Sequence, residues 1–141
     1  MTSPLECVQR LFRSVEDRDF DAMLECYDED VEIHESPVLP YGGVYRGHDG
    51  VRRHAAGFLQ TWEAYQDVEG PRLDPVFVPG RDGTVVVLFR HRAVDPRSGL
   101  VLDEPEVGVY EVAEGKVVRS RMYHFDPLAL AEFLDGAGSP G

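Results

Sequence analysis

The residue best suited to proton-transfer chemistry is a glutamate that ends a short alternating segment. In Val31-Glu32-Ile33-His34-Glu35, residues 31, 33 and 35 share one face if the segment is a strand. A carboxyl group on an apolar inward face loses hydration, which raises its pKa toward the range of a general base. The alternative is a strand-end glutamate that reaches solvent or accepts hydrogen bonds from the Gly42-Gly43 loop. Glu35 is the first candidate catalytic residue.

Two further candidates, His124 and Asp126, lie near the end of the chain. Alternation along residues 116–126 places both on one face with Ser120 and Met122. If that face points inward, His124 could hydrogen-bond Glu35 across a cavity and move a proton near neutral pH, although a histidine among apolar neighbours can also be a core residue. Asp126 directly precedes Pro127, so it could equally cap a helix that begins there.

The spacing of the remaining polar residues gives little support for a metal site or a nucleotide-binding site. There are five histidines, but neither a His-Glu-x-x-His motif nor paired cysteines accompany them. His34 and Glu35 point to opposite faces of the predicted strand. The glycine-rich stretch 42–50 lacks phosphate-loop and dinucleotide fingerprints, so we expect a loop at a cavity mouth. We therefore expect no metal.

The elements that position these groups follow from hydrophobic periodicity. An apolar stripe from Leu5 to Val15, capped by Ser3, predicts a helix of about four turns. Asp19 or Asp21 caps a second helix that carries Phe20, Met23, Leu24 and Tyr27, and a third follows Asp49. Turn residues separate β patterns at about 72–79, 84–95, 100–113 and 116–126, and a short helix closes the chain. This order predicts an α+β domain with an antiparallel meander.

Length, composition and charge restrict the class of protein. The 141 residues are 43% hydrophobic, which fits one globular domain. The net charge of −12 disfavours nucleic acids and anionic membranes as partners. Two cysteines are too few for a disulfide framework, and neither a leader pattern nor a long apolar run occurs. We expect reduced thiols and a cytoplasmic location.

Several short motifs carry a resemblance to a known family. Val8-Gln9-Arg10, Tyr27-Asp28-Glu29-Asp30-Val31, Glu35-Ser36-Pro37, Tyr45-Arg46-Gly47 and Gly115-Lys116-Val117-Val118 are similar to the SnoaL-like branch of the nuclear transport factor two-like superfamily. The resemblance covers roughly residues 4–135. It implies a single domain over residues 1–135, built as a cone-shaped curved antiparallel sheet wrapped by N-terminal helices, with a flexible C-terminal tail at 136–141. It also implies a homodimer through the outer sheet face.

The resemblance extends unevenly to individual catalytic positions. Glu35 matches the base of ketosteroid isomerases, which ends the first strand before a proline. Leu11 stands where those enzymes have an oxyanion-binding tyrosine, and Gly108 stands near the second donor, with Glu106 two residues away on the same face. The isomerase reaction is therefore disfavoured. SnoaL-type polyketide cyclases place a catalytic acid in the last strand, which matches Asp126, or His124 if the register differs by two.

The function implied is cyclisation of a polyketide or similar small, apolar, carbonyl-bearing natural product without a cofactor. Glu35 would act as base or hydrogen-bond acceptor, His124 as proton partner and Asp126 as orienting acid. Closure could proceed by acid–base chemistry or by confinement for a pericyclic step. The alternatives are an epoxide hydrolase or isomerase of the same fold and a non-catalytic module that binds an apolar ligand. The expected substrate-binding wall comprises Phe12, Tyr41, Phe58, Trp62, Phe89, Tyr110 and Met122.

Overall fold

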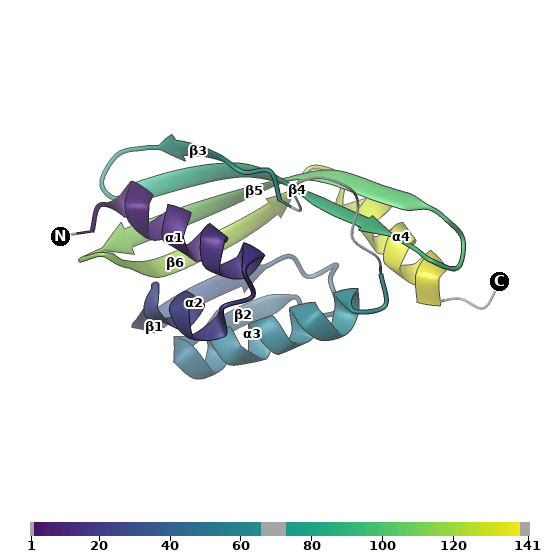
Figure 1. Cartoon of the computed structure of the whole chain (residues 1–141), viewed down its shortest axis with the longest axis horizontal. Helices are drawn as coiled ribbons and strands as arrows, with labels where there is room; N and C mark the ends of the chain where they lie inside the picture. The colour runs from purple at the N-terminus through teal and green to yellow at the C-terminus, as the bar shows by residue number, and fades with distance from the viewer. Residues whose placement is uncertain (1, 66–72, 139–141) are drawn as a thin grey trace.

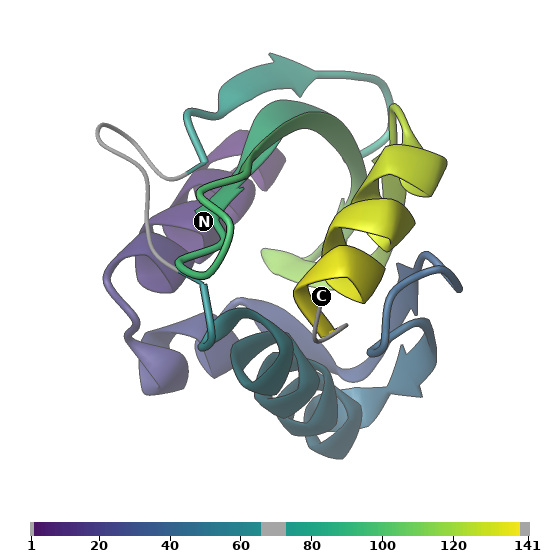
Figure 2. The same ribbon diagram turned by 90° about the vertical axis from the view of Figure 1, so that its right-hand side faces the viewer.

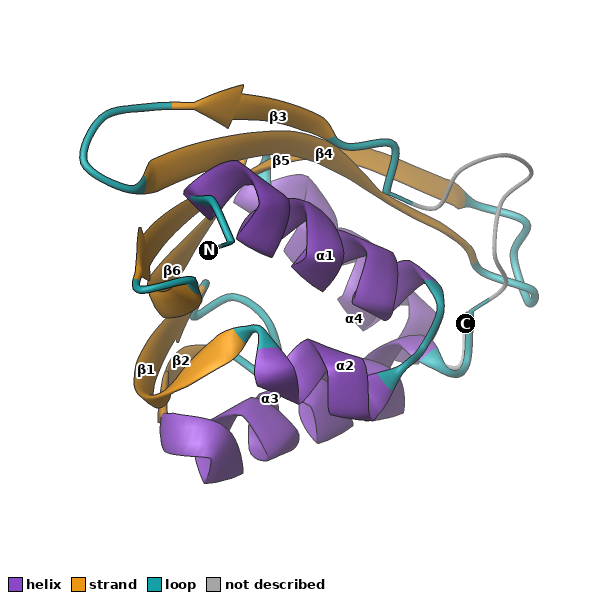
Figure 3. Cartoon of the chain, turned by 60° about the vertical axis from the view of Figure 1, so that its left-hand side comes forward, coloured by secondary structure: helices purple, strands orange, loops and turns teal. Residues whose placement is uncertain are grey.

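The structure, a computed structural model, describes residues 2–65 and 73–138. Its helices are α1 (Pro4–Glu16), α2 (Phe20–Glu25), α3 (Gly47–Trp62) and α4 (Pro127–Gly138). Its strands are β1 (Tyr27–Glu35), β2 (Gly43–Arg46), β3 (Val76–Pro79), β4 (Thr84–Val94), β5 (Val101–Ala113) and β6 (Lys116–His124). The predicted α+β class is confirmed, with a curved sheet whose concave side faces α1, α2 and α3 (Figures 1 and 3).

The N-terminal helices form where the capping residues predict them. Ser3 Oγ accepts a hydrogen bond from the Glu6 amide at 3.1 Å, and Asp19 Oδ1 accepts one from the Ala22 amide at 3.1 Å. The inner stripe of α1 is buried against the sheet and includes Leu11 and Phe12. The second helix is shorter than predicted, because residues 27–30 begin β1.

The sheet has the order β2-β1-β6-β5-β4-β3. Strands β3 to β6 form the predicted antiparallel meander. The expectation of a wholly antiparallel sheet is wrong at one place, because β1 pairs with β6 in parallel, with Ile33 opposite Ser120. These two neighbours in the sheet are far apart in the sequence, because α3 and strands β3, β4 and β5 lie between them along the chain.

Alternation along β5 and β6 determines which side chains face the helices. In β5 the buried positions are every second residue, including Leu102, Glu104, Glu106 and Tyr110. In β4, Val87 is buried, whereas Leu88 is 45% exposed on the outer face with Arg90. Two carboxyl groups of β5 are therefore carried toward the interior.

Side chains from α3, α4 and the far part of the sheet form a second buried cluster. Trp62, Leu102 and Leu130 belong to it, with Phe133 packed against them. Figure 2 looks onto this end of the molecule, where α4 lies near the C-terminus. The cluster closes the end of the fold opposite the start of α1.

Further element boundaries differ from the sequence expectations. The predicted loop 42–50 contains the edge strand β2, where Gly43 pairs with Glu35, and α3 already starts at Gly47. Strand β3 begins at Val76, and residue 72 of its predicted range lies outside the described residues. Helix α4 continues to Gly138, three residues into the expected tail, and residues 139–141 lie outside the description. None of the helices described has the length and apolar character needed to cross a bilayer.

Candidate active site

A cavity of about 260 Å³ lies between the concave side of the sheet and the helices α1, α2 and α3. Most of its wall is apolar, as a site for an organic molecule would be. Six of the seven predicted wall residues line it, namely Phe12, Tyr41, Phe58, Phe89, Tyr110 and Met122. Leu11, which replaces the oxyanion tyrosine, also lines the cavity and contributes no hydroxyl group there.

Trp62 is the predicted wall residue that does not line the cavity. Its indole Nε1 donates a hydrogen bond to the Tyr41 hydroxyl at 2.8 Å, and its ring centroid lies 4.0 Å from that of His91. Trp62 thus supports the wall from the second buried cluster. Its place at the last turn of α3 carries it past the cavity.

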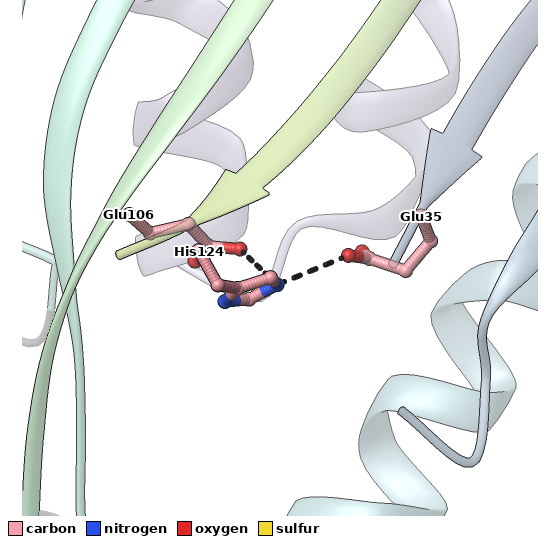
Figure 4. Close-up of side chains that lie close together, drawn as sticks. All are labelled: Glu35, Glu106 and His124. Carbon is pink, nitrogen blue, oxygen red and sulfur yellow. Dashed lines mark hydrogen bonds and ion pairs between the residues drawn. The ribbon is translucent and has the colours of Figure 1, made fainter. Parts of the chain in front are cut away.

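Glu35 projects into the cavity from the end of β1, and its side chain is only 5% exposed. Oε1 accepts a hydrogen bond from the Ser36 amide at 3.1 Å, and Oε2 lies 3.0 Å from His54 Nε2 on α3. His124 Nε2 lies 3.5 Å from Glu35 Oε1, so the predicted contact between these two side chains is present (Figure 4).

His124, at the end of β6, is the centre of a cluster of carboxyl groups. Its side chain is 1% exposed. Nδ1 lies 3.0 Å from Glu104 Oε2, and Nε2 lies 3.2 Å from Glu106 Oε1. Glu106 is the direct cross-strand partner of His124 on β5 (Figure 4). Both ring nitrogens therefore face acceptors.

The surroundings shift the three pKa values in different directions. Burial would raise the pKa of Glu35, but hydrogen bonds with His124 and His54 outweigh it and lower the pKa to about 2. Burial would lower the pKa of His124, but Glu104 and Glu35 raise it to about 10. Burial raises the pKa of Glu106 to about 8, which the charge of His124 opposes. The expected upward shift at Glu35 is wrong, because desolvation is not the only influence on that carboxyl group.

At neutral pH these shifts give an imidazolium at His124, a carboxylate at Glu35 and a neutral carboxylic acid at Glu106. The site then holds a proton acceptor and two hydrogen-bond donors within one small volume. Such a set can remove a proton from a bound molecule and stabilise the negative charge that develops on an oxygen.

Asp126 is not brought into this cluster. Its side chain is exposed, and Oδ1 accepts a hydrogen bond from the Ala129 amide at 3.0 Å, which caps α4. Its own amide donates to Glu104 Oε1 at 3.3 Å. Of the two candidates near the end of the chain, His124 therefore belongs to the buried cluster with Glu35 and Glu106, and Asp126 has a capping contact.

Sequence reasoning did not select His54, His91, Glu104 or Glu106 as site residues. His54, His91 and Glu106 line the cavity, and His91 Nδ1 lies 4.0 Å from Glu106 Oε2. Alternation with Leu102 and Tyr110 was the signal that could have placed both glutamates inward. No comparable signal marks His54, because its burial depends on how α3 packs across β1.

The same cluster contains the residues best placed to hold a metal ion. Ligand atoms of Glu35, Glu106 and His124 lie within 4.8 Å of one another. Carboxylate oxygens with one imidazole nitrogen suit a divalent cation. The hydrogen bonds among these side chains already pair their donors with acceptors, so the arrangement is also complete as a proton network.

Comparison with known proteins identifies the family. The model of the SnoaL-like domain matches residues 8–120. Uncharacterized proteins of Mycobacterium tuberculosis and Mycobacterium bovis are 31% identical over 129 residues, which cover 92% of this chain and 94% of each relative.

Solved structures show the same fold. An NTF2-like protein from Burkholderia thailandensis has a TM-score of 0.78 at 23% identity and covers 99% of this chain and 100% of its own. TerC, co-crystallized with polyporic acid, has a TM-score of 0.77 at 22% identity, with coverage of 94% and 98%. A candidate polyketide cyclase from Xanthomonas campestris has a TM-score of 0.67 at 22% identity, with coverage of 95% and 96%. Together with the family model, these similarities show that the chain belongs to the SnoaL-like domain family.

Proposed function

We propose that the chain is an enzyme that cyclises or isomerises a small, largely apolar, carbonyl-bearing natural product of the polyketide type by proton transfer. The observation that carries this proposal is the buried cluster of Glu35, His124 and Glu106, of which Glu35 and Glu106 line a mostly apolar cavity. Two relatives in fold support the substrate class, namely the candidate polyketide cyclase and the protein crystallised with polyporic acid.

In the proposed reaction, Glu35 removes a proton from the carbon next to the substrate carbonyl. The electron pair of that C–H bond forms a C=C bond, and the carbonyl π electrons move onto oxygen. Glu106, which lines the cavity, donates a hydrogen bond to this oxygen, and the positive charge of His124 behind it stabilises the developing negative charge. Because a carboxylate with a pKa of about 2 is a weak base, the transfer depends on stabilisation of the enolate oxygen by these two groups.

Ring closure would follow from the same enolate. Its carbon attacks a second carbonyl group of the substrate and forms a C–C bond, and the resulting alkoxide takes up the proton held by Glu35. Isomerisation would instead return the proton to another carbon. Both reactions are complete in atoms and charge without a cofactor.

Hydrogen–deuterium exchange of 2-tetralone in D2O tests the proton-transfer step without the natural substrate. We expect the protein to accelerate exchange of the protons next to the carbonyl, and Glu35→Gln to slow it by about 10²-fold or more. Asp126→Asn is the matched control, because asparagine also caps helices and Asp126 lies outside the cluster. Equal rates for the wild type and Glu35→Gln would refute the proposed role of Glu35.

A non-catalytic ligand-binding module is the second candidate, and the apolar wall favours it. Leu11 lines the cavity at the position where the resemblance to ketosteroid isomerases would place a tyrosine, so that hydroxyl group is missing. The low pKa of Glu35 makes its carboxylate a weaker base. Saturable binding of 2-tetralone with no acceleration of exchange by the wild type would favour this module. The same result would be expected if the cavity only confines a substrate for pericyclic closure.

A further inference from the structure

Ser120 is a cavity residue whose hydroxyl group has no role in the site described above. It lies on β6, its side chain is fully buried, and it lines the cavity. Its Oγ has no hydrogen-bond partner among the described residues. Buried hydroxyl groups in folded proteins nearly always have a partner, so this one requires an explanation.

A second serine of the same cavity provides the comparison. Ser14 on α1 is also buried and lines the cavity, but its Oγ donates a hydrogen bond to the Arg10 carbonyl oxygen at 2.8 Å. A helical serine can satisfy itself in this way through the preceding turn. A strand gives Ser120 no such local acceptor on the inward face.

The neighbours of Ser120 offer little compensation. Its direct cross-strand partners are Ile33 on β1 and Tyr110 on β5. The Tyr110 hydroxyl group already points to the Met122 sulfur, at 3.9 Å, a weak acceptor. A trapped water needs two to four polar partners, and the direct cross-strand partners of Ser120 offer one hydroxyl group, that of Tyr110. An oxygen atom carried by an apolar guest would suit the position better.

The distance from Ser120 to the reactive cluster sets the length of such a guest. Ser120 and His124 share one face of β6 and lie four residues apart. With a rise of about 3.3 Å per residue, their Cα atoms are separated by roughly 13 Å. Both Ser120 and Glu106, which pairs with His124, line the same cavity. Glu35 lies nearer, because Ser120 pairs with Ile33, which precedes Glu35 by two residues or roughly 7 Å on β1. The cavity thus has its glutamates at two different distances from Ser120.

We propose that the Ser120 hydroxyl group binds an oxygen atom of the substrate at a second point, four residues along the sheet from His124 and Glu106 and two from Glu35. The substrate class is then an elongated molecule of fused or linked rings with an oxygen substituent at each end. Rotation about the Cα–Cβ bond lets the hydroxyl group turn toward the guest, and it can donate to a carbonyl or accept from a hydroxyl group. The identity of the reacting end rests on the proposed function, whereas the binding contact at Ser120 does not.

Two dyes that differ by one distal hydroxyl group test this contact, namely 2-hydroxyanthraquinone and 2,6-dihydroxyanthraquinone. Titration calorimetry gives the ratio of their dissociation constants for each variant. For the wild type we expect the dihydroxy compound to bind about 5- to 10-fold more tightly, as one added hydrogen bond predicts. Ser120→Ala should reduce this ratio to about one.

Ser14→Ala is the matched control, because it removes a hydroxyl group from the same cavity wall that is already bonded to Arg10. It should keep the wild-type ratio. The thermal midpoint of Ser120→Ala should stay within about 2 °C of the wild type, since no protein hydrogen bond is lost. A wild type that does not distinguish the dyes, or a Ser120→Ala variant that still does, would overturn the proposal.

The 2-tetralone assay separates this inference from the proposed function. That probe has a single oxygen, so its exchange rate reports on proton transfer at Glu35 and not on a second contact. If wild-type exchange is absent while the dye ratio depends on Ser120, proton transfer fails and the second contact stands. If exchange depends on Glu35 while the dye ratio ignores Ser120, the second contact fails and proton transfer stands.

Discussion

His124 determines the chemical state of the cavity at the scale of single residues. If its ring were neutral, with the proton on Nδ1 toward Glu104, the lone pair on Nε2 would face the oxygens of Glu35 and Glu106 at 3.5 and 3.2 Å. Two protonated carboxyl groups would then be needed. An imidazolium donates in both directions and needs no protonated partner, and Glu106 keeps its proton for a separate reason, because burial raises its pKa to about 8. In the resting protein His124 is thus a donor.

Glu106→Gln should change how stability depends on pH. Burial raises the pKa of Glu106 from its ordinary value of 4.5 to about 8 in the folded chain. Between these values the unfolded chain releases the proton and the folded chain retains it, so the wild type loses stability as pH rises. Glutamine mimics the neutral acid and cannot ionise. The free energy of unfolding of the variant, relative to that of the wild type, should therefore rise by up to about 1.4 kcal/mol per pH unit. Urea unfolding from pH 5 to 8 measures this difference.

Glu111→Gln provides the control for this prediction. Glu111 lies on the same strand, but its side chain is 39% exposed and it faces Arg119 at 3.6 Å. The difference in stability between Glu111→Gln and the wild type should stay flat over the same range, because a half-exposed side chain has similar surroundings in the folded and unfolded chains. A flat difference for Glu106→Gln as well would mean that Glu106 is ionised in the cavity.

At the scale of elements, Asp126 connects the last strand to α4. Its side chain caps the helix through the Ala129 amide, and its own amide donates to Glu104, the acceptor of His124 Nδ1. Asp126→Ala should therefore lower the free energy of unfolding by about 1 kcal/mol, and Asp126→Asn should retain it. Thermal and urea unfolding measure this difference. A loss of more than tenfold in 2-tetralone exchange for Asp126→Asn would contradict a purely capping role.

Elements with a strong local signal are predicted from the sequence, and those created by tertiary pairing are not. The stripe of α1 and the alternation of β5 and β6 set both boundaries and faces. Strand β2 has only four residues and exists because β1 offers its edge, so the glycines around it indicated a loop. Helix α2 was extended into β1 for a similar reason, since Tyr27 fits either pattern.

In the candidate site, too, the features with a local sequence signal are predicted and those that depend on tertiary packing are not. Alternation and the family position predict that Glu35 and His124 point inward from the ends of their strands and contact each other, as they do. The pKa of Glu35 was not, because it depends on His54, which α3 brings from nineteen residues away. Strand alternation therefore identifies inward carboxyl groups, but the partners that set their ionisation come from packing between elements.

At the scale of the whole molecule, the outer face of the sheet carries a continuous apolar row. Val76, Leu88, Val107 and Tyr123 are successive cross-strand partners on β3, β4, β5 and β6. Val76, Leu88 and Tyr123 are 57%, 45% and 53% exposed. Val78, Val86 and Val109 form a parallel row beside it. A contiguous exposed apolar surface of this kind is typical of an interaction site.

We predict that a second copy of the chain covers this face in a two-fold symmetric dimer. In such a dimer the same rows meet each other, so one substitution acts twice. Leu88→Asp should raise the dissociation constant of the dimer by at least about 100-fold, measured by sedimentation equilibrium, because it places two buried charges in the interface.

The effect of salt on the stability of the dimer is an independent test of the same prediction. Each copy carries a net charge of −12, so two copies repel each other at long range, and added salt should strengthen the dimer by screening this repulsion. Leu100→Asp is the matched control, because Leu100 is 60% exposed but lies in the turn before β5, away from the apolar rows. It should leave the association unchanged. A wild type that sediments as a monomer at high micromolar concentration and high salt would exclude the dimer, and equal weakening by both substitutions would place the contact elsewhere.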